Sequence, residues 1–123
     1  MPDEVSDARA LLDERRRRHG SIEQVLGIDE DAARLALSAR FGAVAVHTSP
    51  GNEEEAVRER APEGVDAVIE LAGAAELVPA GVRLLRPGGY YSLAGMVHAD
   101  SALDITGEQI IRKGLTVRGG AQL

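Results

Sequence analysis

The sequence predicts a three-layer α/β fold with a parallel sheet. Short apolar runs alternate with segments of helical spacing along most of its 123 residues, and such alternation is typical of parallel sheets covered by helices. Apolar residues make up 44% of the chain but aromatic residues only 2%, so aliphatic side chains must form the core, as in strands buried on both faces. We expect one domain over residues 1–123, with an N-terminal helix over 1–20 and the core over 21–123.

Composition narrows the classes of partner. The net charge is −6, from 20 acidic and 14 basic residues, and an acidic chain attracts polyanions weakly, so we expect neither nucleic acid nor membrane as partner. There is no cysteine, which excludes disulfides and thiolate zinc ligands. No segment resembles a signal peptide or is apolar enough to cross a bilayer, and we therefore expect a cytoplasmic protein.

The first expected element is a helix that Ser6 and Asp7 open and Gly20 ends. The four arginines at 15–18 lie near its end, where the helix dipole favours cations. Acidic neighbours dilute this basic run, so we interpret it as a solvated helix end rather than a nucleic-acid contact.

Two strand–helix pairs follow. An apolar run over 25–28 predicts a strand that ends at Asp29, and the acids after it can cap a helix over 32–41 that Gly42 stops. A second apolar run over 43–47 leads into a turn, after which Asn52 and Glu55 are spaced as a capping box for a helix reaching about Ala61.

The remaining part repeats this alternation. A strand is expected over 65–71, then a helix that ends at the Pro-Gly-Gly segment 87–89, then a strand over 90–95. Thr106 and Gln109 are spaced as a capping box for a short helix, and Leu115–Val117 would form the last strand.

Seven segments share their order and spacing with one known family: Val25–Asp29, Ala33–Leu37, Arg40–Ala43, Gly64–Glu70, Arg83–Gly89, Gly95–Val97 and Ile110–Gly119. Together they resemble the medium-chain, zinc-type alcohol dehydrogenases over about four fifths of the chain. The resemblance implies a Rossmann-like cofactor domain that binds NAD. In a complete enzyme of this family, a hydride moves between an alcohol carbon and the nicotinamide while zinc polarises the oxygen.

Asp29 is the most informative residue for cofactor binding. An acid at the end of the second strand of such a fold accepts hydrogen bonds from the ribose hydroxyls and repels a 2′-phosphate, which selects NAD over NADP. The resemblance implies that Arg34 reaches the same ribose. The alternative interpretation is that Asp29 only caps the following helix.

Main-chain contacts implied by the resemblance complete the candidate site. Backbone around Ala72 and Gly73 would line the adenosine and pyrophosphate side. Backbone near Gly95 and Met96, and at Gly120, would approach the nicotinamide, because small residues let the backbone come close to a cofactor.

The chain also departs from the family. The G-x-G-x-x-G turn that opens this domain and seats the pyrophosphate is not in the sequence. The central first strand is not there either, so the sheet should be incomplete, with a gap between the strands that end at Asp29 and Leu71. Direct pairing across the gap, a second chain in the slot, and rearrangement remain open. NAD binding should be weak or lost.

No catalytic or metal-binding residue is assigned. The family's zinc ligands belong to a catalytic domain with no counterpart in this sequence, and that domain or chain is a possible partner. The three histidines, at 19, 47 and 98, do not have ligand spacing. We interpret His98 as a loop residue in solvent. The chain alone should therefore not be catalytic, and its substrate is not readable.

Two other functions stay open. One is a fragment of an S-adenosylmethionine-dependent methyltransferase, a class that also has an acid-terminated strand and a Pro-Gly-Gly turn but usually ends in an antiparallel hairpin. The other is a non-catalytic dimerisation or regulatory module on a Rossmann scaffold, in which the last strand pairs with its twin in a homodimer.

Overall fold

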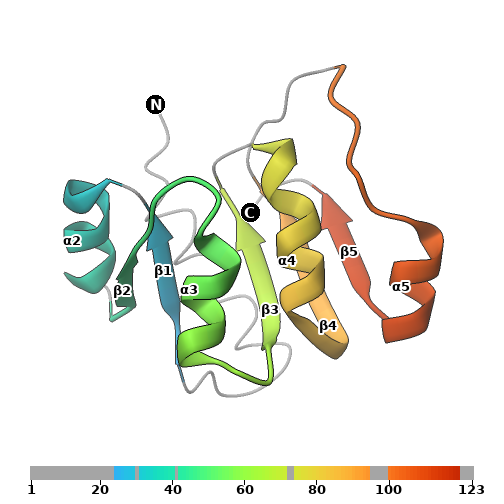
Figure 1. The fold of residues 1–123 in the computed structure, drawn as a ribbon, viewed down its shortest axis with the longest axis horizontal. Coiled ribbons are helices and arrows are strands. Elements are labelled where there is room, and N and C mark those ends of the chain that lie inside the picture. The colour runs from blue at the N-terminus through green and yellow to red at the C-terminus, as the bar shows by residue number, and fades with distance from the viewer. Residues whose placement is uncertain (1–23, 30, 41, 72–73, 95–99, 120–123) are drawn as a thin grey trace. The chain divides into compact units, whose positions relative to one another are not determined.

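The computed structural model describes residues 24–29, 31–40, 42–71, 74–94 and 100–119. The predicted N-terminal helix over 1–20 lies outside these residues and stays a prediction. The chain divides into two compact units, with the boundary between Val57 and Arg58. Figure 1 labels the helices and strands of both units.

The first unit holds a two-stranded parallel sheet. Its elements are β1 (Leu26–Asp29), α2 (Ala32–Arg40), β2 (Val44–His47) and α3 (Glu53–Arg60), the last of which crosses the unit boundary. β1 and β2 run in register from Leu26 opposite Val44 to Asp29 opposite His47. The strands and the intervening helix therefore lie where the apolar alternation predicted them.

Helix α2 packs closely on this sheet. A Cβ atom added at Gly27 of β1 would lie 2.9 Å from the Oγ atom of Ser38, so glycine permits this approach of helix and strand. Leu35 on the same helix is buried. Gly42, with φ +94°, donates its N–H to the carbonyl of Ala39 at 3.0 Å and ends the helix as predicted.

Helix α3 begins differently from the prediction. The Asn52 side-chain amide donates to Ser49 Oγ at 2.6 Å, and the acid that reaches back is Glu53, which accepts from the Gly51 N–H at 3.1 and 3.3 Å. The predicted box between Asn52 and Glu55 is therefore wrong. In the structure the Asn52 side chain bonds to the preceding turn instead.

The second unit holds a three-stranded parallel sheet in the order β3-β4-β5. In Figure 1, α4 lies across β4, and α5 lies beside β5. The elements are β3 (Val65–Glu70), the 3-10 turn η1 (Ala75–Leu77), α4 (Val78–Leu84), β4 (Leu85–Leu93), α5 (Gly107–Lys113) and β5 (Thr116–Gly119).

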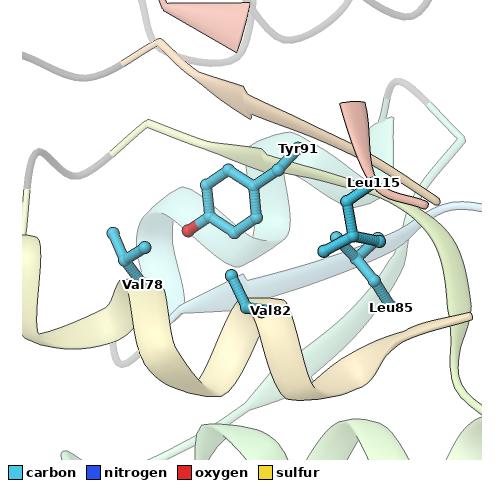
Figure 2. Close-up of a cluster of buried hydrophobic side chains, with 5 residues drawn as sticks. All are labelled: Val78, Val82, Leu85, Tyr91 and Leu115. Atoms are coloured by element: carbon cyan, nitrogen blue, oxygen red, sulfur yellow. The ribbon is translucent and has the colours of Figure 1, made fainter. Parts of the chain in front are cut away.

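An aliphatic core with one aromatic ring joins this sheet to its helices. Figure 2 shows the Tyr91 ring of β4 lying over two valines of α4, with two leucines packed together beside it. All five side chains are buried, as expected for a chain so poor in aromatic residues. They are Val78, Val82, Leu85, Tyr91 and Leu115.

The buried phenol of Tyr91 is an unusual polar element of this core. It is 1% exposed, and within the part of the chain that the structure describes its hydroxyl has no hydrogen-bond partner. Burial, and to a smaller extent the charge of Glu70, raises the pKa of Tyr91 well above its ordinary value. The phenol therefore stays protonated at any physiological pH.

The junction between α4 and β4 corrects one prediction. The helix was expected to run to the Pro-Gly-Gly segment 87–89, but it ends at Leu84, and Leu85 already pairs with Val65 of β3. Pairing then resumes at Ala67 and Tyr90, so the Pro-Gly-Gly segment forms an irregularity inside β4. Pro lacks an N–H and Gly88 has φ +79°, and both features suit a strand irregularity as well as a helix end.

The short helix α5 confirms the predicted capping box. Thr106 Oγ1 accepts from the Gln109 N–H at 3.2 Å, and Gln109 Oε1 accepts from the Thr106 N–H at 2.8 Å. Gly114, with φ +62°, ends the helix. The start of the helix was readable from the sequence because the two residues of the box lie close together in the chain.

The predicted α/β class with parallel, incomplete sheets is confirmed. The gap was expected between β1 and β3, and among the described residues these strands belong to different sheets and do not pair directly. Among these residues, no helix is both long enough and apolar enough to cross a membrane.

Candidate functional site

Asp29 lies at the carboxyl end of β1, next to the end of β2. Its carbonyl accepts a hydrogen bond from the Thr48 N–H at 3.0 Å, and its register partner is His47. Pairing with β2 therefore fixes the position of the Asp29 backbone, from which the carboxylate projects. In open parallel sheets, ligands bind beyond this carboxyl edge.

A different acid caps α2. The Asp31 Oδ1 atom accepts from the N–H groups of Ala33 and Arg34 at 2.8 and 3.1 Å, which is the geometry of an N-cap. Asp29 instead accepts the Asp31 N–H at 3.0 Å. Asp29 is therefore not the residue that caps α2, because Asp31 already occupies that position.

Asp29 holds Arg34 through two parallel hydrogen bonds. Arg34 Nε lies 2.7 Å from Asp29 Oδ2, and Arg34 Nη2 lies 2.9 Å from Oδ1. The Asp29 side chain is 23% exposed and that of Arg34 is 52% exposed. The structure thus brings together the two residues that the sequence assigned to one ribose.

The Asp29 carboxylate could accept hydrogen bonds from the hydroxyls of a ribose. A carboxylate is an acceptor only, with about four lone-pair directions, and the adjacent hydroxyls of a ribose are donors that suit it. Because Arg34 contacts both carboxylate oxygens, a ribose would have to share or replace its hydrogen bonds. The exposed guanidinium can turn outward at modest cost, since an exposed ion pair contributes little to stability.

The other assigned positions lie outside the described residues. They are Ala72, Gly73, Gly95, Met96 and Gly120, and also His19 and His98. Nearby, the Ala94 N–H donates to the Glu70 carbonyl at 3.0 Å, which ties together the ends of β3 and β4. No group of three or more metal-ligating side chains occurs in the residues that the structure describes.

His47 is a residue that sequence reasoning overlooked. It was weighed only as a metal ligand, whereas the structure places it opposite Asp29 at the edge of the sheet. The signal was present in the sequence, because two neighbouring predicted strands end in a titratable residue, Asp29 and His47.

Comparison with known proteins identifies the family. The chain matches the zinc-binding dehydrogenase family over residues 17–121. It belongs to that family. A sorbitol dehydrogenase of Halalkalibacterium halodurans is 31% identical over 103 residues, which are 82% of this chain and 30% of the relative. This zinc-binding dehydrogenase chain thus spans less than a third of the length of that relative.

Solved structures agree with this assignment. A Sinorhizobium meliloti 1021 protein, described as a zinc-binding dehydrogenase and bound to NADP, is 31% identical with a TM-score of 0.73 over 83% of this chain and 31% of its own. An alcohol dehydrogenase of Thermus sp. ATN1 is 30% identical with a TM-score of 0.69 over 84% of this chain and 30% of its own. The Rossmann-like class of the fold is therefore confirmed.

The unit formed by α5 and β5 bears on the methyltransferase alternative. α5 leads into β5, which pairs in parallel with β4. An antiparallel terminal hairpin was the expected mark of the methyltransferases, and the described residues do not form one there. The zinc-binding dehydrogenase assignment thus agrees with the topology.

Proposed function

We propose that this zinc-binding dehydrogenase chain binds the adenosine half of NAD through Asp29. One observation supports this proposal: two neighbouring acids have different roles. Asp31 caps α2, while the Asp29 carboxylate lies at the carboxyl edge of the sheet. That carboxylate would accept hydrogen bonds from the ribose hydroxyls while still sharing its lone pairs with Arg34. We expect this binding in the cytoplasm.

The residues fit NAD better than NADP. A 2′-phosphate beside Asp29 would meet a partly buried negative charge. Arg34 opposes this effect, but its charge is already engaged by Asp29 at 2.7 Å. The Sinorhizobium meliloti protein holds NADP, so the relative affinities of this chain for NAD and NADP have to be measured.

The reaction that we propose for the whole enzyme is alcohol oxidation. Bound NAD would supply the hydride acceptor. Within the described residues, Asp29 and Arg34 would hold and orient the adenosine end, and we assign them no proton transfer. Since the chain spans less than a third of its relative, we propose that it is not catalytic alone and that other residues supply zinc and substrate contacts.

Calorimetric titration tests the proposal. The purified chain is titrated with NADH, NADPH and S-adenosylmethionine, and NADH should bind most tightly, though weakly. In Asp29→Ala the preference for NADH over NADPH should fall about tenfold or more, because a charge-assisted contact of about 1.5–3 kcal/mol is lost. The matched control is Asp31→Ala, which should destabilise α2 by about 1 kcal/mol yet keep the preference.

The results separate the alternatives. A preference that persists in Asp29→Ala, or falls equally in Asp31→Ala, would show that the ribose assignment is wrong. Binding of S-adenosylmethionine alone would revive the methyltransferase alternative. If none of the three ligands binds, the cofactor function is rejected for this chain.

A second candidate function is association through β5. In the described part of the sheet β5 is an edge strand that pairs only with β4, and such edges are templates for pairing with another chain. The preceding helix α5 exposes Ile111, a residue that is 80% exposed. We propose that a homodimer would use this edge.

A further inference from the structure

We propose that the second unit contains a binding site for a compact monovalent cation, and that the ε-ammonium of Lys113 is its resident occupant. The site consists of three main-chain carbonyl oxygens, which belong to Val82, Arg83 and Leu85. Lys113 Nζ lies 3.0, 3.1 and 2.9 Å from these oxygens. A free cation of the same class, such as ammonium, would bind there once the lysine side chain is removed.

The end of α4 brings the three oxygens together. The helix stops at Leu84, and Leu85 has an extended backbone with φ −71° and ψ 135°, so its carbonyl does not continue the row of helical carbonyls. The carbonyls of Val82 and Arg83 belong to the last turn, which carries the negative end of the helix dipole. Oxygens from two differently directed backbone segments therefore meet at one nitrogen.

The distances and the type of ligand define the class of cation. Oxygen atoms bind Mg²⁺ at about 2.0–2.1 Å and Ca²⁺ at about 2.3–2.6 Å, usually with carboxylates among them. The three carbonyls are neutral and lie farther from the nitrogen, at 2.9 to 3.1 Å, so they suit a larger ion with a single charge. An ammonium group also has three N–H donors on one nitrogen, which matches three acceptors.

The surroundings of the site favour a positive charge. Lys113 is half-buried, and its bonds to the carbonyls of Val82 and Leu85 are partly buried. Arg58 Nη2 also donates to the Arg83 carbonyl, at 2.9 Å, so two cations share that one oxygen. Because charge interactions strengthen where water is partly excluded, these carbonyls attract a cation more strongly than carbonyls in open solvent would.

The composition of the chain agrees with a site for ammonium in particular. Lys113 is the one lysine among the 14 Lys and Arg residues of this sequence, and all the others are arginine. The adjacent Arg112 has a side chain that is 76% exposed and pairs with Glu108 at 2.7 Å. A guanidinium is planar and presents its donors as a fork, whereas an ammonium is a compact point charge. We therefore expect that arginine cannot replace Lys113.

A cation supplied from solution tests the site. Lys113→Ala removes the ammonium, and its urea unfolding is followed by circular dichroism in ammonium chloride and in tetramethylammonium chloride at equal ionic strength. Ammonium has N–H donors, whereas tetramethylammonium has the same charge and no donor. The unfolding equilibrium constant should fall about twofold in ammonium at a concentration equal to its dissociation constant, and about tenfold at ten times that concentration. Tetramethylammonium should have no such effect.

Control proteins separate the site from a general effect of salt. Arg112→Ala loses only the exposed pair with Glu108, and the two salts should affect it as they affect wild type. Lys113→Arg keeps the charge but should stay less stable than wild type, because the fork does not match the three carbonyls. The proposal is overturned if ammonium stabilises Lys113→Ala no more than Arg112→Ala, or if Lys113→Arg is as stable as wild type.

Folding of the variants is not a precondition for the test. If Lys113→Ala is unfolded in tetramethylammonium, ammonium should restore its circular dichroism signal, and a chain unfolded in both salts overturns the proposal. In wild type, acetylation of Lys113 is compared between native buffer and urea by mass spectrometry, with Nα-acetyl-lysine as internal reference. The seated ammonium should react about tenfold or more slowly in native buffer, since only the opened form exposes it. Equal relative rates would show that the carbonyls do not hold it.

Discussion

At the residue scale, two acids of the same chemistry act differently because of where the backbone places them. Asp31 stands one residue before α2 and accepts the N–H groups of its first turn, while Asp29 ends a strand and holds Arg34. The sequence showed a cluster of acids here but not their division of work, since a capping acid and a ligand-binding acid look the same until dihedral angles are known.

Gly81 offers a stability prediction at the same scale. A Cβ atom there would lie 2.5 Å from Cε2 of the buried Tyr91 ring, a clash that the packed core cannot absorb without shifting. Gly81→Ala should lower the free energy of unfolding by about 1–3 kcal/mol, as overpacking does, although alanine favours helix. Urea unfolding followed by circular dichroism measures it.

Gly107 supplies the matched control. It is the first residue of α5, and a Cβ atom there would have no neighbour within 4 Å. Gly107→Ala should therefore be neutral or stabilising by up to about 1 kcal/mol. If both substitutions changed the free energy of unfolding equally, close packing of the Tyr91 ring against Gly81 would not be the cause.

At the element scale, a lysine on one helix closes the end of another. Lys113 Nζ donates to the carbonyls of Val82, Arg83 and Leu85 at 3.0, 3.1 and 2.9 Å. Arg58 Nη2 adds a bond to the Arg83 carbonyl at 2.9 Å. Cations are favoured at a helix C-terminus, where carbonyls lack partners, so this contact fastens α5 to α4.

Removal of that ammonium should be costly. Lys113→Met keeps the aliphatic stem but leaves carbonyls at the end of α4 without their donor, and we expect a loss of about 1–3 kcal/mol in the free energy of unfolding. The control is Arg112→Met, which breaks only the exposed pair with Glu108 and should cost less than about 0.5 kcal/mol. A Lys113 variant as stable as the control would show that water replaces the ammonium.

At the scale of the whole molecule, the sheet edge at β5 bears on assembly. If β5 pairs with a second copy, sedimentation should show a dimer at high concentration, and the β5 amides that face away from β4 should gain protection from hydrogen exchange. A monomer at every concentration, with unprotected β5 amides, would reject association through this edge.

The sequence by itself determined the elements and the family. Apolar alternation located β1, α2, β2 and β3, and spacing within a few residues located the Thr106–Gln109 capping box, because these features depend on near neighbours. The ordered motifs also indicated the zinc-binding dehydrogenase family, which the match over residues 17–121 confirms.

Only the tertiary structure decided which side chains meet. It moved the start of β4 to Leu85, whose burial beneath α4 outweighs the local Pro-Gly-Gly signal, and it placed Lys113 on carbonyls about 30 positions away. It also set His47 beside Asp29. The physical reason is common to all three, since pairing between strands and packing between helices join residues that no local pattern connects.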